Sequence, residues 1–257
     1  MRSLKNTVAW VTGAGTGIGQ AGALALARDG AVTVLSGRRP EPLEETAEMI
    51  RNAGGEAVVE PMDIADATAV DAVVRNIADR FGRLDILVNS AGINVPERHW
   101  TKMTPDGWRQ VISIDLDGAF YCCSAVMPMM RDQKDGLIIN ISSWAGRFVS
   151  YLTGPAYTAA KHGMVALTSS INHEEFRNGI RACSICPAEV ATPILDKRPV
   201  PVSDADKARM LQQEDLGETI LFVARMPAHV CVHEILISPT HNRGYMASPD
   251  MVAPAPD

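Results

Sequence analysis

The sequence predicts an α/β protein: one domain with a doubly wound parallel sheet of about seven strands and helices on both faces. Short apolar runs alternate with helix-length amphipathic stretches along the chain, which is typical of this fold class. Most runs are continuously apolar, as expected of strands buried on both faces. No linker interrupts the alternation, so residues 1–240 are expected to form the domain and residues 241–257, with their scattered prolines, an irregular tail.

The elements follow one another in regular order. Strands are expected at residues 7–11, 31–36, 56–61, 84–88, 137–141, 181–186 and 230–237. Helical patterns lie between them, at residues 17–29, 41–53, 66–81, 104–131 and 154–177. The longest two helices, 104–131 and 154–177, carry apolar residues on more than one face, as helices that also pack against another subunit do.

Composition excludes several classes of function. Lys and Arg number 24 against 30 Asp and Glu, a net charge of −6 with no basic stripe, so we expect no nucleic-acid partner. No uninterrupted apolar run approaches the length of a membrane span. The five cysteines and the absence of a secretory signal at the start favour a reducing, cytoplasmic location. We expect no metal site, because Cys183 and Cys186 lie in a strand and are more consistent with core filling.

A glycine-rich turn joins the first strand to the first helix. Residues 12–19 read Thr-Gly-Ala-Gly-Thr-Gly-Ile-Gly. Glycines in such a turn let the main chain approach a pyrophosphate, which the N–H groups at the helix start then bind. A turn with a purely structural role is the alternative. We therefore expect cofactor contacts from the following residues: Gly13, Gly15, Thr16, Gly17, Ile18 and Gly19.

The end of the second strand indicates which cofactor is bound. An NAD site usually places an acidic residue here to accept a hydrogen bond from the ribose 2′-hydroxyl. This chain has Gly37, Arg38 and Arg39 instead, and a guanidinium group matches a 2′-phosphate. The sequence therefore favours NADP(H), with contacts from both arginines. NAD(H) is the alternative, in which the two arginines are simply solvated.

A tyrosine and a lysine four residues apart suggest the chemistry. Tyr157 and Lys161 share one face of a helix. A phenol is a poor base at neutral pH, but an adjacent ammonium stabilises the phenolate. Ser143 follows the fifth strand, at the edge of an α/β sheet where ligands bind. Together they predict proton exchange with a substrate oxygen while a hydride moves at the carbon.

Taken in order, these motifs resemble the short-chain dehydrogenase/reductase family over nearly the full chain. The matching residues are Thr12-Gly13-x-x-x-Gly17-x-Gly19, Asp63, Asn89-Ser90-Ala91-Gly92, Ser143, Tyr157-x-x-x-Lys161 and Pro187…Thr192. The resemblance implies a Rossmann-type fold, with Ser143 holding the substrate oxygen, Tyr157 as acid/base and Lys161 on the nicotinamide ribose. It also implies that Asp63 and Ile64 line the adenine. Further cofactor contacts are implied from Asn89, Ala91, Gly92, Pro187, Val190 and Thr192.

The chain departs from the family pattern at three places. Asp115 stands where the family has its catalytic asparagine. That position uses its main-chain carbonyl to hold a water below the lysine, so aspartate can keep the role, and its carboxylate would raise the pKa of Lys161. Pro187-Ala188 replaces Pro-Gly, and the last strand lacks the usual Asp-Gly-Gly ending. That ending resembles the subgroup of NADP-dependent 3-hydroxy-acid, serine-type and sulfoacetaldehyde reductases.

The sequence thus predicts an oxidoreductase that transfers a hydride between NADP(H) and a carbonyl or secondary alcohol of a small molecule. Arg147 and Glu189 are candidate substrate contacts, since a guanidinium at residue 147 can pair with a carboxylate or sulfonate. A solvent-facing Arg147, or anion contacts from Lys197 and Arg198, are the alternatives. A second class of function is a non-catalytic dinucleotide-sensing protein. The expected assembly is a homotetramer, or else a dimer.

Overall fold

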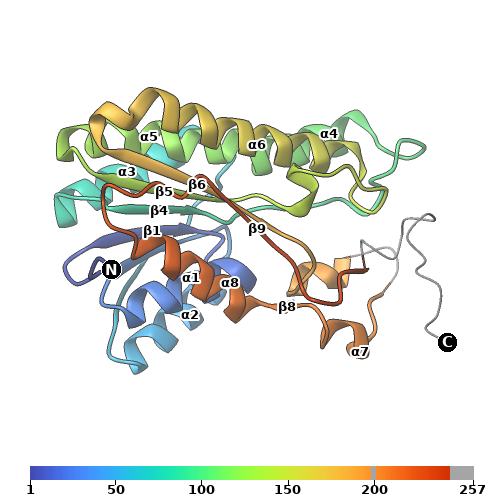
Figure 1. The fold of residues 1–257 in the computed structure, drawn as a ribbon, viewed down its shortest axis with the longest axis horizontal. Helices are drawn as coiled ribbons and strands as arrows, with labels where there is room; N and C mark the ends of the chain where they lie inside the picture. The colour runs from blue at the N-terminus through green and yellow to red at the C-terminus, as the bar shows by residue number, and fades with distance from the viewer. Residues whose placement is uncertain (198–200, 244–257) are drawn as a thin grey trace.

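Seven parallel strands form one twisted sheet in the order β3-β2-β1-β4-β5-β6-β9 (Figure 1). The computed structural model describes residues 1–197 and 201–243. Every neighbouring pair in the sheet is parallel, which confirms the predicted fold class. The strands are β1 (Val8–Thr12), β2 (Val32–Ser36), β3 (Glu56–Val59), β4 (Ile86–Asn89), β5 (Gly136–Ile141), β6 (Ile180–Pro187) and β9 (Glu234–Ile237).

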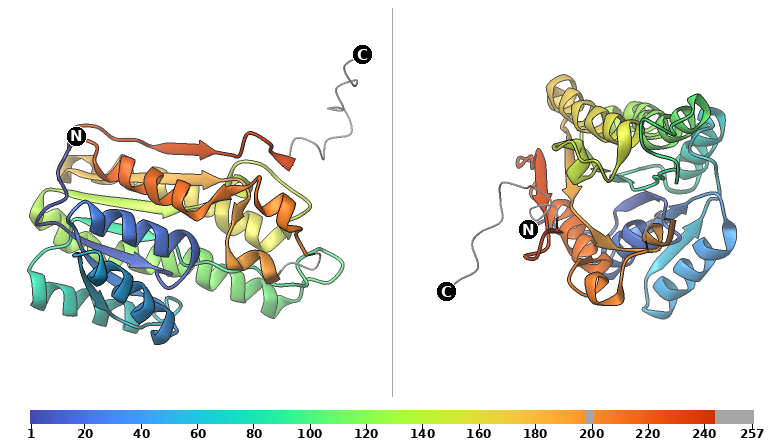
Figure 2. Two further views of the ribbon diagram at one scale, coloured as in Figure 1. Left: turned by 90° about the horizontal axis from the view of Figure 1, so that it is seen from below. Right: turned by 90° about the vertical axis from the view of Figure 1, so that its right-hand side faces the viewer.

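Helices cover both faces of the sheet (Figures 1 and 2). One face carries α1 (Gly17–Arg28), α2 (Pro40–Asn52) and α8 (Gln213–Ala224). The other carries α3 (Ala67–Phe81), α4 (Pro105–Ile112), α5 (Gly118–Gln133) and α6 (Gly154–Glu175). This three-layer arrangement follows from the alternation of strand and helix in the sequence.

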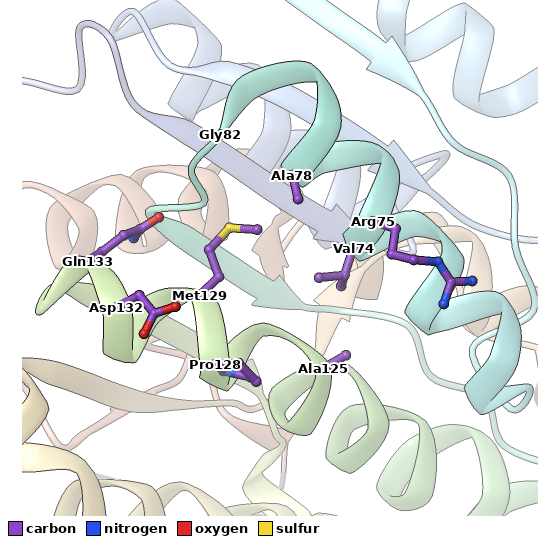
Figure 3. A pocket seen from close by; sticks show the side chains of 9 residues that line it. All are labelled: Val74, Arg75, Ala78, Gly82, Ala125, Pro128, Met129, Asp132 and Gln133. Atoms are coloured by element: carbon purple, nitrogen blue, oxygen red, sulfur yellow. The ribbon is translucent and has the colours of Figure 1, made fainter.

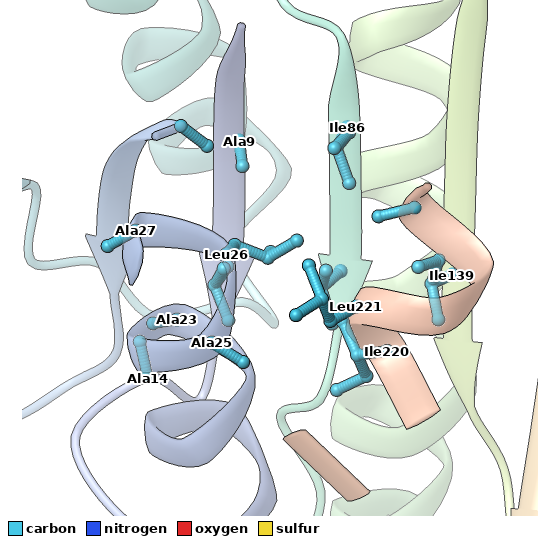
Figure 4. Packing of buried hydrophobic residues seen from close by; sticks show 14 of the residues in the cluster. Ala9, Ala14, Ala23, Ala25, Leu26, Ala27, Ile86, Ile139, Ile220 and Leu221 are labelled. Atoms are coloured by element: carbon cyan, nitrogen blue, oxygen red, sulfur yellow. The ribbon is translucent and has the colours of Figure 1, made fainter. Parts of the chain in front are cut away.

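Two hydrophobic cores lie on opposite sides of the sheet. Adjacent residues of β5 divide between them: Ile139 packs with Leu26 of α1 and Leu221 of α8 (Figure 4), whereas Ile138 packs in the other core. Successive side chains of a strand point to opposite faces. This is why the strands are apolar throughout, the feature that predicted a parallel sheet.

The strand order reverses between β1 and β4. Strand β1 pairs with β2 on one side and with β4 on the other, so the connections after β1 and β4 leave in opposite directions. In sheets of this type such a reversal opens a ligand-binding crevice at the carboxyl ends of the strands.

The elements between β6 and β9 were not predicted from the sequence. Helix α8 lies between β6 and β9, together with a short helix α7 (Asp204–Lys207) and a two-stranded ladder of β7 (Val190–Ala191) and β8 (Leu211–Gln212). The sequence does carry the signal, because Gln212 and Asp215 form a capping box at the start of α8. Ile220 of α8 packs against Gly22 of α1, where an added Cβ would lie 2.7 Å from its Cδ1.

Two predicted elements have different bounds. The expected helix over 104–131 is split into α4 and α5 by a π-helical turn at Ser113–Asp117. The expected strand over 230–237 begins only at Glu234. The carbonyl oxygen of Val230 accepts a hydrogen bond from the Arg181 guanidinium instead of joining the sheet.

The helical stretch Pro105–Gln133 is long and apolar enough, by length and composition, to cross a membrane, but half of its apolar window is buried inside the fold. Its halves pack against α3 and α6, as core helices do. That the protein has no membrane partner remains a prediction from the sequence.

Candidate active site

The catalytic residues predicted from the sequence meet at the carboxyl end of β5. Lys161 of α6 donates a hydrogen bond from Nζ to the carbonyl oxygen of Ile141, the last residue of β5, at 3.1 Å. In return, the Ser142 hydroxyl donates to the main-chain oxygen of Lys161 at 2.9 Å. These two bonds fix the start of α6 to the end of the strand.

Tyr157 lies one helical turn before Lys161. The ammonium of Lys161 is 5.4 Å from the centre of the Tyr157 ring. Lys161 is only 4% exposed, whereas the tyrosine is half-buried and accessible to a ligand. The cation is therefore held out of water beside the phenol, as the spacing in the sequence predicted.

Ser143 begins the short 3-10 turn Trp144–Gly146. Its Oγ accepts a hydrogen bond from the main-chain N–H of Ala145 at 3.1 Å and is half-buried. The acceptor role orients the hydroxyl and leaves its proton for another acceptor, such as a substrate oxygen.

Asp115 occupies the π-helical turn between α4 and α5 and has no exposed surface. Its Oδ1 accepts from the main-chain N–H of Ile93 at 2.8 Å, and its Oδ2 lies 3.4 Å from Lys161 Nζ. Gly92 makes this approach possible. An added Cβ there would lie 3.2 Å from Oδ2 and 3.3 Å from Nζ. The contact to lysine thus uses the side chain of residue 115.

The buried pair has shifted pKa values. Burial raises the pKa of the Asp115 carboxyl above its ordinary value, against the opposing effects of Lys161 and the Ile93 N–H. Burial lowers the pKa of the Lys161 ammonium, but the Asp115 carboxylate, aided by Tyr157, outweighs this and leaves that pKa raised. This is the direction expected from the sequence. Lys161 is therefore a cation at neutral pH.

The glycine turn, called the glycine cradle below, packs too closely against main-chain atoms to hold side chains at Gly13 and Gly19. Gly13 has φ +65°, and a Cβ there would lie 2.8 Å from the main-chain nitrogen of Ala91. A Cβ on Gly19 would lie 2.3 Å from the oxygen of Gly13. Thr16 begins α1 without a side-chain capping bond, and the first turn holds no acidic residue. Free N–H groups at a helix start suit a pyrophosphate, so the cradle fits a dinucleotide.

The loop after β4 is tied to the end of β1. The Thr12 hydroxyl oxygen accepts from the main-chain N–H groups of Ser90 and Ala91, at 3.2 and 3.3 Å. Asn89 is buried and donates to Asn140 of β5 at 2.9 Å. Asn89 therefore supports the crevice from below by linking two strands.

The residues predicted at the adenine end lie near the ends of β2 and β3. Arg38 and Arg39 are exposed directly after β2. Asp63 is exposed, and its carboxylate accepts from the N–H of Ala65 at 3.0 Å. Ile64 is buried and packs against Gly118, where an added Cβ would lie 2.8 Å from its Cγ1. The 2′-phosphate contacts of the two arginines and the adenine contacts of Asp63 and Ile64 stay predictions.

The chain after β6 crosses the glycine turn. Pro187 ends β6, Val190 is buried in β7, and the methyl group of Thr192 lies over Gly17, whose added Cβ would be 3.3 Å from it. The structure thus brings Thr192 to the cofactor cradle.

The two predicted substrate contacts are already paired within the chain. Arg147 Nε lies 3.0 Å from Glu234 of β9. Glu189 accepts two hydrogen bonds from Arg243, at 2.7 and 2.8 Å, and Arg243 also reaches Asp206 of α7. Neither partner was predicted, since no local sequence pattern marks a pair so distant along the chain.

Three residues assigned to the irregular tail, 241–243, are thus still tied to the domain through Arg243. Of the rival anion contacts, Arg198 and the side chain of Lys197 lie outside the described structure.

A hollow of about 500 Å³ lies elsewhere, between α3 and α5 (Figure 3). It is lined by Val74, Met129 and Gln133 among others. Gln133 hydrogen-bonds the main chain of Leu84, shortly before β4 begins. The hollow is therefore at the end of the sheet opposite to Ser143, Tyr157 and Lys161, and it contains none of the predicted site residues.

Comparisons with known proteins identify the family of the chain. The family described as short chain dehydrogenase matches residues 7–200. The uncharacterized oxidoreductase YxbG of Bacillus subtilis is 38% identical over 197 residues, which are 77% of this chain and 71% of the relative.

Solved structures are also similar. A metagenomic short-chain oxidoreductase in complex with NADP is 31% identical, with a TM-score of 0.80 over 93% of this chain and 99% of the other. Levodione reductase is 27% identical, with a TM-score of 0.85 over 91% and 96% of the two chains.

Proposed function

The chain belongs to the short-chain dehydrogenase family of oxidoreductases, and we propose that it interconverts a carbonyl group and a secondary alcohol of a small molecule with NADP(H). One observation carries the proposal. The buried ammonium of Lys161 stands beside the accessible phenol of Tyr157, at the strand end that also presents Ser143.

The cofactor supplies or accepts the hydride when it is bound. The glycine turn and the start of α1 would hold its pyrophosphate, since the first turn of α1 carries no acidic residue and Thr16 makes no side-chain capping bond to its N–H groups. Arg38 would pair with the 2′-phosphate and Lys161 with the nicotinamide ribose.

The chain's own residues bind the substrate oxygen and transfer the proton. The Ser143 hydroxyl donates a hydrogen bond to the substrate oxygen and orients it. As a carbonyl becomes an alcohol, the Tyr157 hydroxyl gives its proton to that oxygen. The Lys161 ammonium stabilises the phenolate left behind. In the reverse direction the phenolate takes the proton back. Such acid–base catalysis typically contributes about 10²–10⁴-fold in rate.

Preference for NADP(H) over NAD(H) is supported by the exposed pair Arg38 and Arg39 and by the lack of an acidic residue at the end of β2. The similar metagenomic oxidoreductase was solved with NADP. Calorimetric titration with NADPH and NADH tests this. We expect NADPH to bind more tightly, and Arg38→Asp to shift the preference toward NADH. Equal affinities in the parent protein would contradict it.

The subgroup of reductases for small anionic substrates stays a proposal for this chain. The ion pair between Arg147 and Glu234 would have to open before Arg147 could bind a carboxylate or sulfonate. Oxidation of NADPH in the presence of matched aldehydes, β-keto acids and their neutral esters, cyclic ketones and quinones identifies the substrate class. No turnover of any carbonyl compound would instead favour a dinucleotide-sensing protein.

The proposed assembly is a homotetramer. Phe120 of α5 is 50% exposed and Trp108 of α4 is 38% exposed, on the helices that the family pairs between subunits. Light scattering at micromolar concentration should give a tetramer, or a dimer as the smaller unit. A monomer would refute the proposal.

A further inference from the structure

A buried carboxylate is in direct ionic contact with the proposed catalytic lysine. We propose that Asp115 is a positioning residue: its side chain holds the Lys161 ammonium charged and in place beside Tyr157. This inference rests on the proposed function. It differs from the family pattern, in which the main-chain carbonyl at this position acts through a water.

The geometry assigns the two carboxylate oxygens to different partners. Oδ1 is occupied by the N–H of Ile93 at 2.8 Å. Oδ2 is buried and has no hydrogen-bond partner among the described residues, and it faces Lys161 Nζ at 3.4 Å. A buried acceptor with no other partner is costly, so the ion pair is the interaction that keeps this oxygen inside the protein.

The ammonium has three N–H donors. The carbonyl oxygen of Ile141 takes one at 3.1 Å, and the Asp115 carboxylate faces another. One donor is left for a ligand hydroxyl. Asp115 therefore limits how the lysine can turn and directs its remaining N–H group.

The surroundings of Lys161 make its charge depend on Asp115. Asp115, Tyr157 and Cys186 are the titratable groups that act on the lysine, and burial opposes all three. Among the groups that raise the pKa of Lys161, Asp115 has the largest effect. Without this carboxylate, burial favours the neutral amine. Loss of the charge would remove both the stabiliser of the phenolate and the ribose contact.

The conservative variant Asp115→Asn tests this. An amide can still accept from Ile93, but it carries no charge. The alkaline limb of the pH–rate profile for carbonyl reduction should move to lower pH by about 1–3 units, the usual effect of one close opposite charge. The pH at which NADPH affinity declines should fall likewise. Identical profiles for parent and variant would overturn the proposal.

Unfolding of the cofactor-free protein gives a readout that does not need turnover. In the parent, the raised pKa of Lys161 means that its contribution to stability is present below the unfolded value near 10.5 and lost above it. In Asp115→Asn, burial lowers that pKa, so stability is poorest at neutral pH and recovers as the pH rises. The difference in melting temperature between the parent and Asp115→Asn should therefore become smaller as the pH rises from 7 to 10. A constant difference would contradict the proposal.

Asp85→Asn is the matched control. Asp85 is also buried and ion-paired, but with Arg83, just before β4 begins. Arginine does not titrate in this range, so the melting-temperature difference of Asp85→Asn should stay constant from pH 7 to 10. A narrowing there as well would show that the effect is not specific to the lysine pair, and would overturn the assignment.

A double variant keeps the test decisive if Asp115→Asn does not fold. Lys161→Met leaves the carboxylate buried alone, and Asp115→Asn/Lys161→Met removes both charges. The double variant should melt at the higher temperature, and the opposite order would refute the pairing. If the parent reduces no carbonyl compound, the proposed function fails, while these melting experiments still decide whether the pair exists.

Discussion

The carboxyl ends of β5 and β6 are adjacent in the sheet but are built differently. At β5, Lys161 and Ser142 are held by bonds to main-chain atoms inside the protein. At β6, the following segment is held by Arg243, which reaches Glu189 and Asp206 from the far end of the chain through half-buried ion pairs. The bonds at β5 hold the catalytic residues in a fixed geometry. The ion pairs at β6 involve only side chains near the surface, so substitutions there can change the shape of the segment.

The largest effect is expected at the β5 end. Lys161→Ala should lose roughly 10²–10⁴-fold in turnover and also bind NADPH more weakly, because the ammonium is proposed to serve both the phenol and the ribose. Steady-state kinetics with a parallel cofactor titration check this. Unchanged cofactor affinity would contradict the proposed contact between Lys161 and the ribose.

The next largest effect is expected from a substitution in the glycine cradle. Gly13→Ala places a Cβ 2.8 Å from the main-chain nitrogen of Ala91, so the turn must shift and NADPH affinity should fall at least tenfold. Gly82→Ala is the matched control, with the same φ of +65° but nothing within 4 Å of the added Cβ. Both should lose about 1–2 kcal/mol of stability from the left-handed backbone. Equal cofactor affinities in the two variants would argue against the cradle.

Substitutions of Ser143 and Ser142 should have different effects, the first on turnover and the second on stability. Ser143→Ala should reduce turnover about tenfold or more with little change in cofactor affinity, since its hydroxyl is proposed to bind the substrate oxygen. Ser142→Ala removes the bond to the Lys161 carbonyl oxygen and should cost about 0.5–1.5 kcal/mol of stability. Thermal unfolding and kinetics on both variants distinguish them. A Ser143→Ala enzyme of parental rate would remove that serine from the site.

The smallest effect is expected at the β6 end. Arg243→Met should change KM by a few-fold, because Glu189 lies at the base of the segment that carries Thr192, and should cost no more than about 1 kcal/mol of stability at this half-exposed site. Arg225→Met removes a similar two-bond pair, with Asp29, away from the site. Arg225→Met should lose about as much stability as Arg243→Met but leave KM unchanged. A shift in KM for both would show a general effect of destabilisation.

The same contrast explains what the sequence could predict. The order of strands and helices, and the meeting of Tyr157 and Lys161, follow from local periodicity and from spacing within one helix. Helix α8 was predictable too, since its capping box is visible in the sequence. The pairs Arg147–Glu234 and Glu189–Arg243 were not, because their partners are brought together only by the folded chain.

Asp115 falls between these cases. Its position was identified from the resemblance to the family, but its side-chain contact was not, because the π-helical turn that aims the carboxylate at Lys161 leaves no periodic signal in the sequence. If residue 115 acted only through its main-chain carbonyl, Asp115→Asn would have a mild effect. The ion pair between Asp115 and Lys161 means that the side chain matters as well.

The central claim is that Tyr157 moves the proton, and Tyr157→Phe tests it most directly. The ring still packs, but the hydroxyl is gone. The account predicts a loss of roughly 10²–10⁴-fold in turnover of a good substrate, with NADPH affinity within a few-fold of the parent in the same preparation. A variant that keeps most of the parental rate while binding the cofactor normally would contradict the account.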